Sequence, residues 1–300
     1  MPELPDVELY LFSLRRVVVG HQLTRVLIKS PFLLRTFDPP PDAAVGRTLA
    51  GVARIGKRII LDFGDELYFV LHLMIAGRLR WTEKINAAPP GKVGLAAFAF
   101  DNGTLLLVES ASQKRASLHV VRGRGELAQF DRGGLDVMTS DIDAVHQRLA
   151  ASGRTLKRAL TDPAILDGIG NAWSDEILHA ARLSPFKRTR DLSRDETQRL
   201  VESAVALLRR STERLEQQFA AKFPGPGDVT AFRPEFAVHG KFGQPCPACG
   251  TAVQRVRFAE NEMNYCPRCQ TGGRVLADRS LSRLLRDDWP KTVEELENGN

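Results

Sequence analysis

The spacing of hydrophobic residues near the start of the chain predicts an amphipathic helix. Residues 5–19 carry apolar side chains three or four positions apart, namely Val7, Leu11, Leu14 and Val18. This interval places the apolar side chains on one face of a helix. Gly20 follows the last of them and is a typical helix stop.

A series of short apolar segments follows this helix, rich in β-branched or aromatic residues. They are Thr24–Ile28, Ile59–Phe63, Leu67–Leu73, Leu95–Phe100, Thr104–Val108 and Leu118–Arg122. Turn signals such as Gly64-Asp65 and Asp101-Asn102-Gly103 separate them. This pattern predicts an N-terminal β-sandwich.

From Ser140 onward the hydrophobic period becomes helical. The shorter predicted helices are Asp141–Ala150, Leu156–Leu160, Pro163–Asp167 and Asn171–Ala181. Ser193 and Glu196 have the spacing of a capping box, which opens a long helix to about Phe219. Residues 221–234 are rich in proline and glycine and predict a loop. A last short amphipathic helix before a polar tail is predicted by Leu281, Leu284 and Leu285.

The four cysteines of the chain form two closely spaced pairs, Cys246 with Cys249 and Cys266 with Cys269. The pattern C-x2-C-x16-C-x2-C is typical of a four-thiolate zinc site on two facing knuckles. The alternative is a pair of disulfides, which would need an oxidising compartment. The spacing favours zinc, and four thiolates leave no open position for water, so the metal is expected to be structural.

Composition indicates a globular protein with room for two cores. The chain has 300 residues, of which 43% are hydrophobic and 26% charged. The net charge of +6 and the pI near 9.3 favour a polyanionic partner such as nucleic acid. We find no signal peptide and no apolar run long enough to span a bilayer, so we expect a cytoplasmic, nucleoid-associated protein without a membrane partner.

The first residues suggest a nucleophile. Removal of Met1 would leave Pro2 as the terminus, and its secondary amine would be partly uncharged at neutral pH and able to attack a carbonyl carbon. Glu3 is a carboxylate beside that amine and is suited to move protons. The alternative is structural, because proline and carboxylates also suit the first turn of a helix.

A glycine-containing turn before one predicted helix is a second candidate site. Gly168, Gly170 and Asn171 bring backbone N–H groups to a helix N-terminus, where a phosphate can bind. The alternative is a plain tight turn in which Asn171 is the N-cap.

Taken together, these motifs resemble those of the formamidopyrimidine-DNA glycosylase and endonuclease VIII family, nearer its formamidopyrimidine branch. The resemblance rests on Pro2–Glu8, Gly56–Arg58, His72-Leu73 with Gly77, Asp167–Glu176, and the segment from Gly243 to Gln270. It implies an α+β multidomain fold: a β-sandwich flanked by helices, a helix-two-turn-helix domain and a zinc ribbon. We therefore expect domains at 1–135, 136–235 and 236–275, followed by a tail at 276–300. The implied partner is double-stranded DNA containing oxidised bases or abasic sites, bound by a monomer.

The resemblance also implies catalytic roles. Pro2 would attack C1′ of the damaged nucleotide and form a Schiff base, and Glu3 would shuttle protons during ring opening and elimination. Lys57 would contact a phosphate next to the lesion. Asp6 stands where the family usually has glutamate, and we expect it to support the start of the helix.

DNA contacts are implied at His72 and Asn171, which correspond to phosphate-binding residues of the family, although His72 is also compatible with a core position. Family members fill the gap left by the everted nucleotide with three side chains. Here Ile75 replaces a methionine, Lys114 or Arg115 would supply the cation, and Ala116 stands where an aromatic residue is expected.

The ribbon also departs from the family pattern, at His239, Lys241 and Asn261. The expected function is a bifunctional glycosylase and abasic-site lyase acting on oxidised bases. The alternatives are a non-catalytic DNA lesion-binding protein and a lyase acting mainly on abasic or single-stranded sites. Residues 224–227 lie where the formamidopyrimidine branch recognises oxidised guanine, and the preferred lesion stays open.

Overall fold

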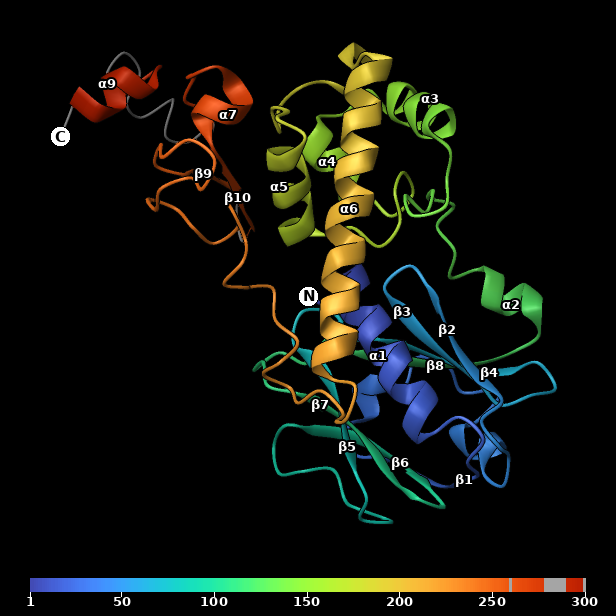
Figure 1. Cartoon of the computed structure of the whole chain (residues 1–300). Helices are drawn as coiled ribbons and strands as arrows, with labels where there is room; N and C mark the ends of the chain where they lie inside the picture. Colours follow the sequence, from blue (N-terminus) through green and yellow to red (C-terminus); the bar gives the residue numbers. More distant parts are fainter. Residues whose placement is uncertain (259–260, 278–289, 299–300) are drawn as a thin grey trace. The chain divides into compact units, whose positions relative to one another are not determined.

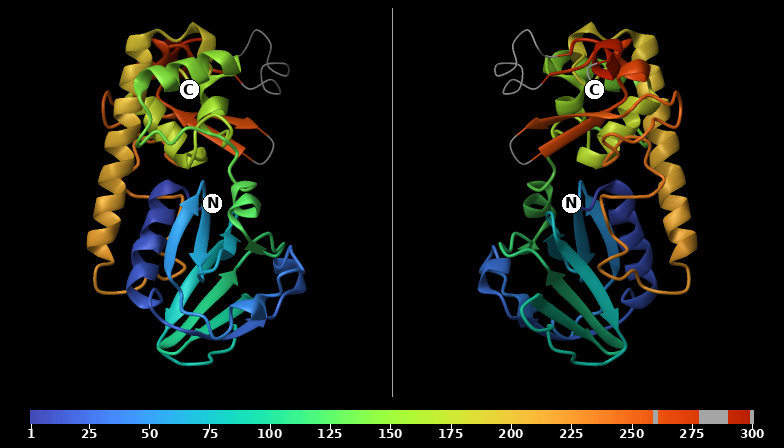
Figure 2. Two further views of the ribbon diagram at one scale, coloured as in Figure 1. Left: turned by 90° about the vertical axis from the view of Figure 1, so that its right-hand side faces the viewer. Right: turned by 90° about the vertical axis from the view of Figure 1, so that its left-hand side faces the viewer.

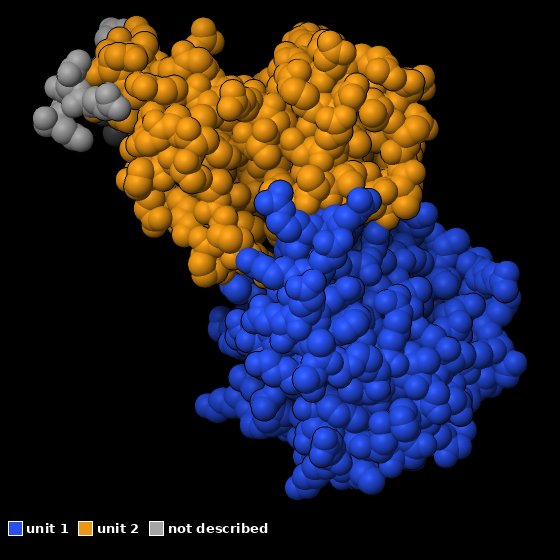
Figure 3. Space-filling model, in the orientation of Figure 1, with its two compact units in different colours: residues 1–132, 209–231 blue, residues 133–208, 232–300 orange. Residues whose placement is uncertain are grey.

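The computed structural model describes residues 1–258, 261–277 and 290–298 (Figure 1). The chain forms two compact units, which are coloured separately in Figure 3. Unit 1 comprises residues 1–132 and 209–231, and unit 2 comprises residues 133–208 and 232–300. This grouping differs from the four-part division expected from the sequence, which stays a prediction.

The predicted first helix is confirmed as α1, Leu4–Val17. Pro5 lies in its first turn, where the missing N–H costs no helical hydrogen bond. Its apolar face is fully buried, and Gly20 lies beyond its end with a φ of 85°. That left-handed conformation suits glycine and explains the stop.

The predicted β-sandwich is confirmed in unit 1, where two four-stranded sheets have the orders β1-β6-β7-β5 and β2-β3-β4-β8. The strands of the first sheet are β1 Leu23–Ile28, β6 Gly94–Phe100, β7 Gly103–Glu109 and β5 Gly77–Thr82. Those of the second are β2 Gly51–Ile55, β3 Arg58–Asp62, β4 Leu67–His72 and β8 Ser117–Arg122. Each strand pairs with its neighbours in antiparallel orientation. The strands β2 and β5 were not predicted from the sequence.

Alternate residues of the strands enter different cores. In β4, Leu67, Phe69 and Leu71 pack in the main core with α1, whereas Tyr68 and Val70 pack with residues of α2 and its surroundings. This period of two is that of a pleated strand buried on both faces. Figure 2 shows α1 alongside the strands of unit 1.

Unit 2 begins with helices. They are α3 Ile142–Ser152, α4 Leu156–Leu160 and α5 Asn171–Ala180, and α6 Arg194–Gln218 runs from unit 2 into unit 1. Further short helices are α2 Arg124–Ala128, η1 Pro31–Leu33, η2 Pro41–Ala44 and η3 Thr189–Asp191. The predicted capping box is confirmed, since Glu196 N donates to Ser193 Oγ and Ser193 N donates to Glu196 Oε2.

One predicted helix is wrong. Residues 163–165 form a turn, Leu166 pairs with Leu135 in an isolated bridge, and Asp167 lies in a bend. A run of five residues allows barely one hydrogen-bonded turn, so the long-range bridge outweighs local helical preference.

The end of unit 2 contains a two-stranded ribbon, β9 Gln254–Phe258 paired with β10 Asn261–Tyr265, followed by α7 Pro267–Thr271. The helix α9, Val293–Asn298, lies in the tail. The short helix predicted at Leu281–Leu285 lies outside the described residues. Within the described part of the chain, no helix is both long and apolar enough to cross a membrane.

Candidate active site and zinc centre

The start of α1 is held by two buried acidic side chains. The backbone N–H of Glu3 donates to Asp6 Oδ2 at 2.9 Å. The carbonyl of Glu3 accepts from the N–H groups of Asp6 and Val7. Pro2 is also buried, and Glu3 and Asp6 are only 3% and 2% exposed. Asp6 therefore fixes the backbone at the residue that precedes the helix.

The amino group of the chain lies in a charged, partly buried environment. It belongs to Met1, and burial lowers its pKa below the ordinary value. Glu3 and Asp6 act to raise this pKa, whereas Arg78 and Lys57 act to lower it. A lowered pKa increases the fraction of neutral, nucleophilic amine at neutral pH.

Lys57 lies in a two-residue hairpin turn. Ile55 of β2 pairs with Arg58 of β3, which leaves Gly56 and Lys57 as the loop. Tight turns of this kind require a positive φ, and Gly56 has a φ of 60°. The glycine therefore explains why this lysine is placed close enough to the amine to affect its pKa.

His72 lies at the end of β4 among basic groups. It pairs with Arg58 of β3 on one side and with Ser117 of β8 on the other. Burial lowers its pKa to about 4, helped by the charges of Arg58, Lys57 and His119. His72 is therefore neutral at physiological pH, and its ring contacts the sulfur of Met74.

The turn after His72 exposes an apolar side chain. Ile75 is 55% exposed, although it belongs to the residue types that usually lie in a core. Gly77 closes the turn by donating to the carbonyl of Leu73, and a Cβ at Gly77 would collide with that same carbonyl. Arg78 donates hydrogen bonds to the carbonyls of Ile75, Gly77 and Val229. These bonds fix the backbone of the turn that presents Ile75.

The loop between β7 and β8 is organised by Glu109, which is 1% exposed. Its carboxylate accepts from the N–H groups of Arg115 and Ala116. The ammonium group of Lys114 turns back to the carbonyls of Glu109 and Ala111. Arg115 is exposed, and Ala116 is buried in the main core. Of the two predicted cations, Arg115 is thus the one presented to solvent.

Sequence reasoning missed Arg78 and Glu109. The run Gly-Arg-Leu-Arg-Trp-Thr at 77–82 alternates polar and apolar residues, a strand signal that would have placed Arg78 on β5. Glu109 ends a run of buried residues in β7, and nothing in its local spacing indicates its backbone contacts six and seven residues further on.

Asn171 lies in unit 2 and is the first residue of α5. The N-cap of this helix is Gly170. The interpretation of Asn171 as an N-cap is therefore wrong. The side-chain amide of Asn171 donates to the carbonyl of Glu262 in β10 at 2.9 Å. This bond ties the predicted phosphate-binding turn to the ribbon.

Two buried acids of α5 attach the helix to the ribbon. Asp175 accepts from Lys157 Nζ at 2.5 Å, from His239 Nδ1 at 2.7 Å and from the backbone of Asn264. Glu176 accepts from the three successive backbone N–H groups of residues 237–239. These contacts give His239 a structural partner and show that it is not a spare metal ligand.

The four cysteine sulfurs converge, because one ligand atom from each lies within 4.8 Å of all the others. Cys246 and Cys266 are buried, and Cys249 and Cys269 are half-buried. This arrangement fits a tetrahedral Zn²⁺ with four thiolate ligands. The zinc ion would hold the two knuckles together and has no open position for chemistry.

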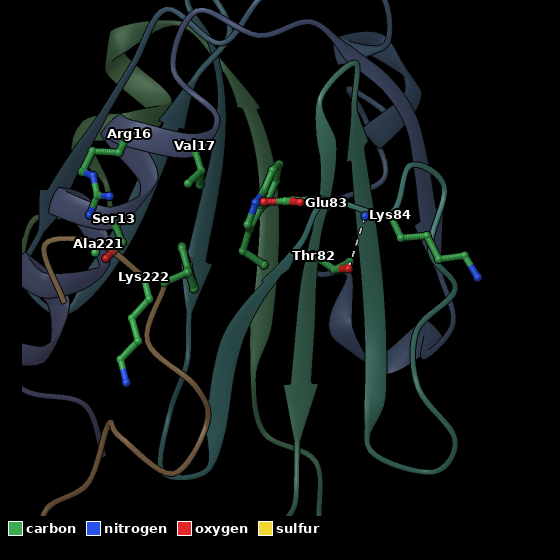
Figure 4. Close-up of a pocket in the computed structure, with 10 residues that line it drawn as sticks. Ser13, Arg16, Val17, Thr82, Glu83, Lys84, Ala221 and Lys222 are labelled. Atoms are coloured by element: carbon green, nitrogen blue, oxygen red, sulfur yellow. Dashed lines mark hydrogen bonds between the residues drawn. The ribbon is translucent and has the colours of Figure 1, made fainter.

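A separate pocket of about 530 Å³ lies beside the C-terminal half of α1 (Figure 4). Ser13, Arg16, Trp81 and Lys222 are among its lining residues. Ser13 is ten residues beyond Glu3, or about 15 Å along the helix axis, so the pocket is distinct from the group around the amine.

Three family models match consecutive parts of the chain. The Formamidopyrimidine-DNA glycosylase N-terminal domain matches residues 1–114, the H2TH domain of the same enzymes matches 135–221, and a zinc finger found in FPG and IleRS matches 243–272. The Formamidopyrimidine-DNA glycosylase of Thermomicrobium roseum is 32% identical over 90% of this chain and 99% of its own length. The chain belongs to the formamidopyrimidine-DNA glycosylase family.

Two further relatives match this glycosylase, one over most of the chain and one over about half of it. The enzyme of Laribacter hongkongensis is 30% identical over 90% of this chain and all of its own. An uncharacterized formamidopyrimidine-DNA glycosylase-like protein of Mycobacterium tuberculosis is 42% identical over 51% of this chain and 91% of its own.

Solved structures with this fold include Lactococcus lactis Fpg in complex with abasic-site DNA. That structure has a TM-score of 0.79 and 25% identity, and the match covers 90% of this chain and 99% of the other. The same Lactococcus enzyme bound to DNA with an oxidized pyrimidine matches equally well, with a TM-score of 0.79. The fold of this DNA glycosylase is therefore that of Fpg.

Proposed function

We propose that this DNA glycosylase excises oxidised bases and then cleaves the abasic site through a Schiff base on Pro2. The observation that carries the proposal is the environment of the terminal amine. Burial, Arg78 and Lys57 lower the pKa of the Met1 amine, which directly precedes Pro2, and Glu3 follows Pro2 on a helix start fixed by Asp6.

In the proposed reaction, Met1 is first removed, so that the nitrogen of Pro2 becomes a secondary amine. This nitrogen attacks C1′ as the bond between C1′ and the damaged base breaks, and the base leaves with a proton. The nitrogen then loses its proton and the C1′–O4′ bond of the sugar breaks as O4′ takes up a proton, which leaves an iminium between Pro2 and C1′. The iminium acidifies the neighbouring C2′–H, and removal of this proton expels the 3′ phosphate. Glu3 is placed to carry protons in these steps. Water finally hydrolyses the iminium and frees Pro2.

DNA is the proposed partner. Lys57 and Arg58 lie beside the neutral ring of His72 at one end of the second sheet, and Arg115 is exposed on the loop between β7 and β8. Basic groups of this kind bind phosphates and position a duplex without reading its sequence. The Lactococcus relatives were solved with abasic or oxidised DNA, which supports the same substrate class here. We propose a monomer that acts on chromosomal DNA in the bacterial cytoplasm.

A second candidate is a lyase acting mainly on abasic or single-stranded sites. Ala116 is buried, and Lys114 turns back to its own loop, so Ile75 is the exposed apolar candidate for filling the duplex. When fewer side chains fill the space left by the everted nucleotide, the protein regains less of the free energy that unstacking costs in a duplex. Comparing excision of the same lesion from duplex and single strands separates the two candidates.

Borohydride trapping on an abasic-site duplex tests the proposed chemistry. The protein is made with a removable N-terminal extension, so that one preparation serves as its own control. We expect no adduct before cleavage of the extension and a covalent adduct on Pro2 afterwards, located by mass spectrometry of the peptide. Equal trapping in both forms would contradict the assigned nucleophile. Tight binding without any adduct would favour a non-catalytic lesion-binding protein.

A further inference from the structure

His179 lies against the zinc centre from outside the cysteine knuckles. Its Nε2 is 3.2 Å from Cys246 Sγ, within hydrogen-bonding range for a sulfur acceptor. His179 is 9% exposed and Cys246 is 2% exposed, so water competes little for this contact. The two residues are 67 positions apart, and His179 belongs to α5.

The direction of the hydrogen bond follows from the chemistry of the site. A cysteine that holds zinc is a thiolate, which can only accept, so Nε2 must carry the hydrogen and donate it. Four thiolates also outweigh the charge of one zinc ion, which leaves negative charge on the sulfurs. A donor aimed at one of them stabilises that charge and orients the ligand.

The position of His179 on α5 supports the same assignment. Asp175 and Glu176 precede it by four and three residues, so all three side chains share one face of the helix. Asp175 and Glu176 bind the backbone and His239 at the edge of the ribbon. His179 extends that face to the metal ligands.

We propose that His179 is a positioning residue of the zinc centre, which donates a hydrogen bond from Nε2 to the thiolate of Cys246. The bond strengthens zinc retention and links the metal to α5, the helix that begins at Asn171. This assignment depends on the zinc site alone and not on the glycosylase chemistry.

The wild-type protein allows a direct test. Zinc is replaced by an NMR-active cadmium isotope, and correlation spectra are recorded between the metal and nearby protons. We expect a coupling between cadmium and the Nε2 proton of His179, transmitted through the Cys246 sulfur. Absence of this coupling, while the cysteine β-protons show theirs, would overturn the proposal.

Variants test the effect on the metal. H179F preserves a ring but removes the donor, and H179Q keeps an N–H donor. In the cobalt-substituted protein, we expect H179F to shift the sulfur-to-metal charge-transfer band to lower energy and H179Q to shift it less. Transfer of zinc to a chelator should be about tenfold or more faster in H179F, since loss of a group hydrogen-bonded to a metal ligand changes metal affinity by this order.

The matched control is H146F. His146 also lies in unit 2, but its ring is hydrogen-bonded to the hydroxyl of Thr197 and not to a zinc-binding cysteine. The control should leave the band and the zinc-transfer rate unchanged. An H179F protein that is folded by circular dichroism, with the wild-type spectrum and rate, would refute the role. If H179F does not fold, the cadmium coupling in the wild type still decides.

Discussion

Replacing Glu176 by glutamine should loosen the attachment of the ribbon to α5. The carboxylate accepts three backbone N–H groups, from Ala237 at 2.7 Å, Val238 at 2.9 Å and His239 at 2.8 Å. A glutamine has the same shape but only one acceptor oxygen. Its NH₂ group replaces the other oxygen and faces one or two of the backbone N–H groups, to which it cannot bond. At least one hydrogen bond is therefore lost, and the others become neutral.

The magnitude follows from the type of bond. A hydrogen bond to a charged acceptor contributes about 1.5–3 kcal/mol and a neutral one about 0.5–1.5 kcal/mol. The exchange of three charged bonds for two neutral ones would cost about 4 kcal/mol on this scale. Burial raises the pKa of Glu176, which shows that the buried charge has its own cost. The neutral glutamine avoids that cost, which offsets part of the lost hydrogen-bond energy. We therefore expect the attachment to be weakened by about 2 kcal/mol.

Amide hydrogen exchange provides the measurement. A loss of about 2 kcal/mol corresponds to roughly thirtyfold faster exchange at residues 237–239 if these amides exchange by local opening. The matched control is Glu202→Gln, because Glu202 is an exposed residue of α6 that accepts from Gln198. Unchanged exchange at 237–239, or an equal increase in the control, would refute the reasoning.

Three further predictions concern other parts of the molecule. Cys249→Ser should release zinc and weaken DNA binding, as measured by metal content and by titration with a duplex; a zinc-free protein with full affinity would contradict this. Glu109→Gln should lower the free energy of unfolding by about 1–3 kcal/mol in urea, because both carboxylate oxygens accept from loop N–H groups; an unchanged midpoint would argue against it. The pKa of His72 falls from 6.5 to about 4 on folding, so the unfolded chain binds more protons in this window and stability falls as the pH drops through it. His72→Gln should remove up to about 3 kcal/mol of this acid sensitivity, and an unchanged dependence of unfolding free energy between these pH values would count against the assigned environment.

Local patterns in the sequence were sufficient for several elements. The helix α1, the capping box of α6 and six of the strands follow from hydrophobic period and cap residues, which act between neighbouring residues. The zinc centre follows from the spacing of four cysteines, because each knuckle needs its two ligands close together in the chain. The strand β2 was missed because its five residues are only half-buried or exposed and carry a weak period. The strand β5 was missed although residues 77–82 alternate polar and apolar side chains.

The partners of the site residues depend on contacts between distant segments. Arg78 joins the group around the amine because β5 and the loop at Val229 come together in the folded chain. Glu176 and His179 face the ribbon because α5 packs on it, across 61 and 67 residues of sequence. Such pairings are set by packing and by the need to satisfy buried polar groups, and neither leaves a periodic trace in the sequence.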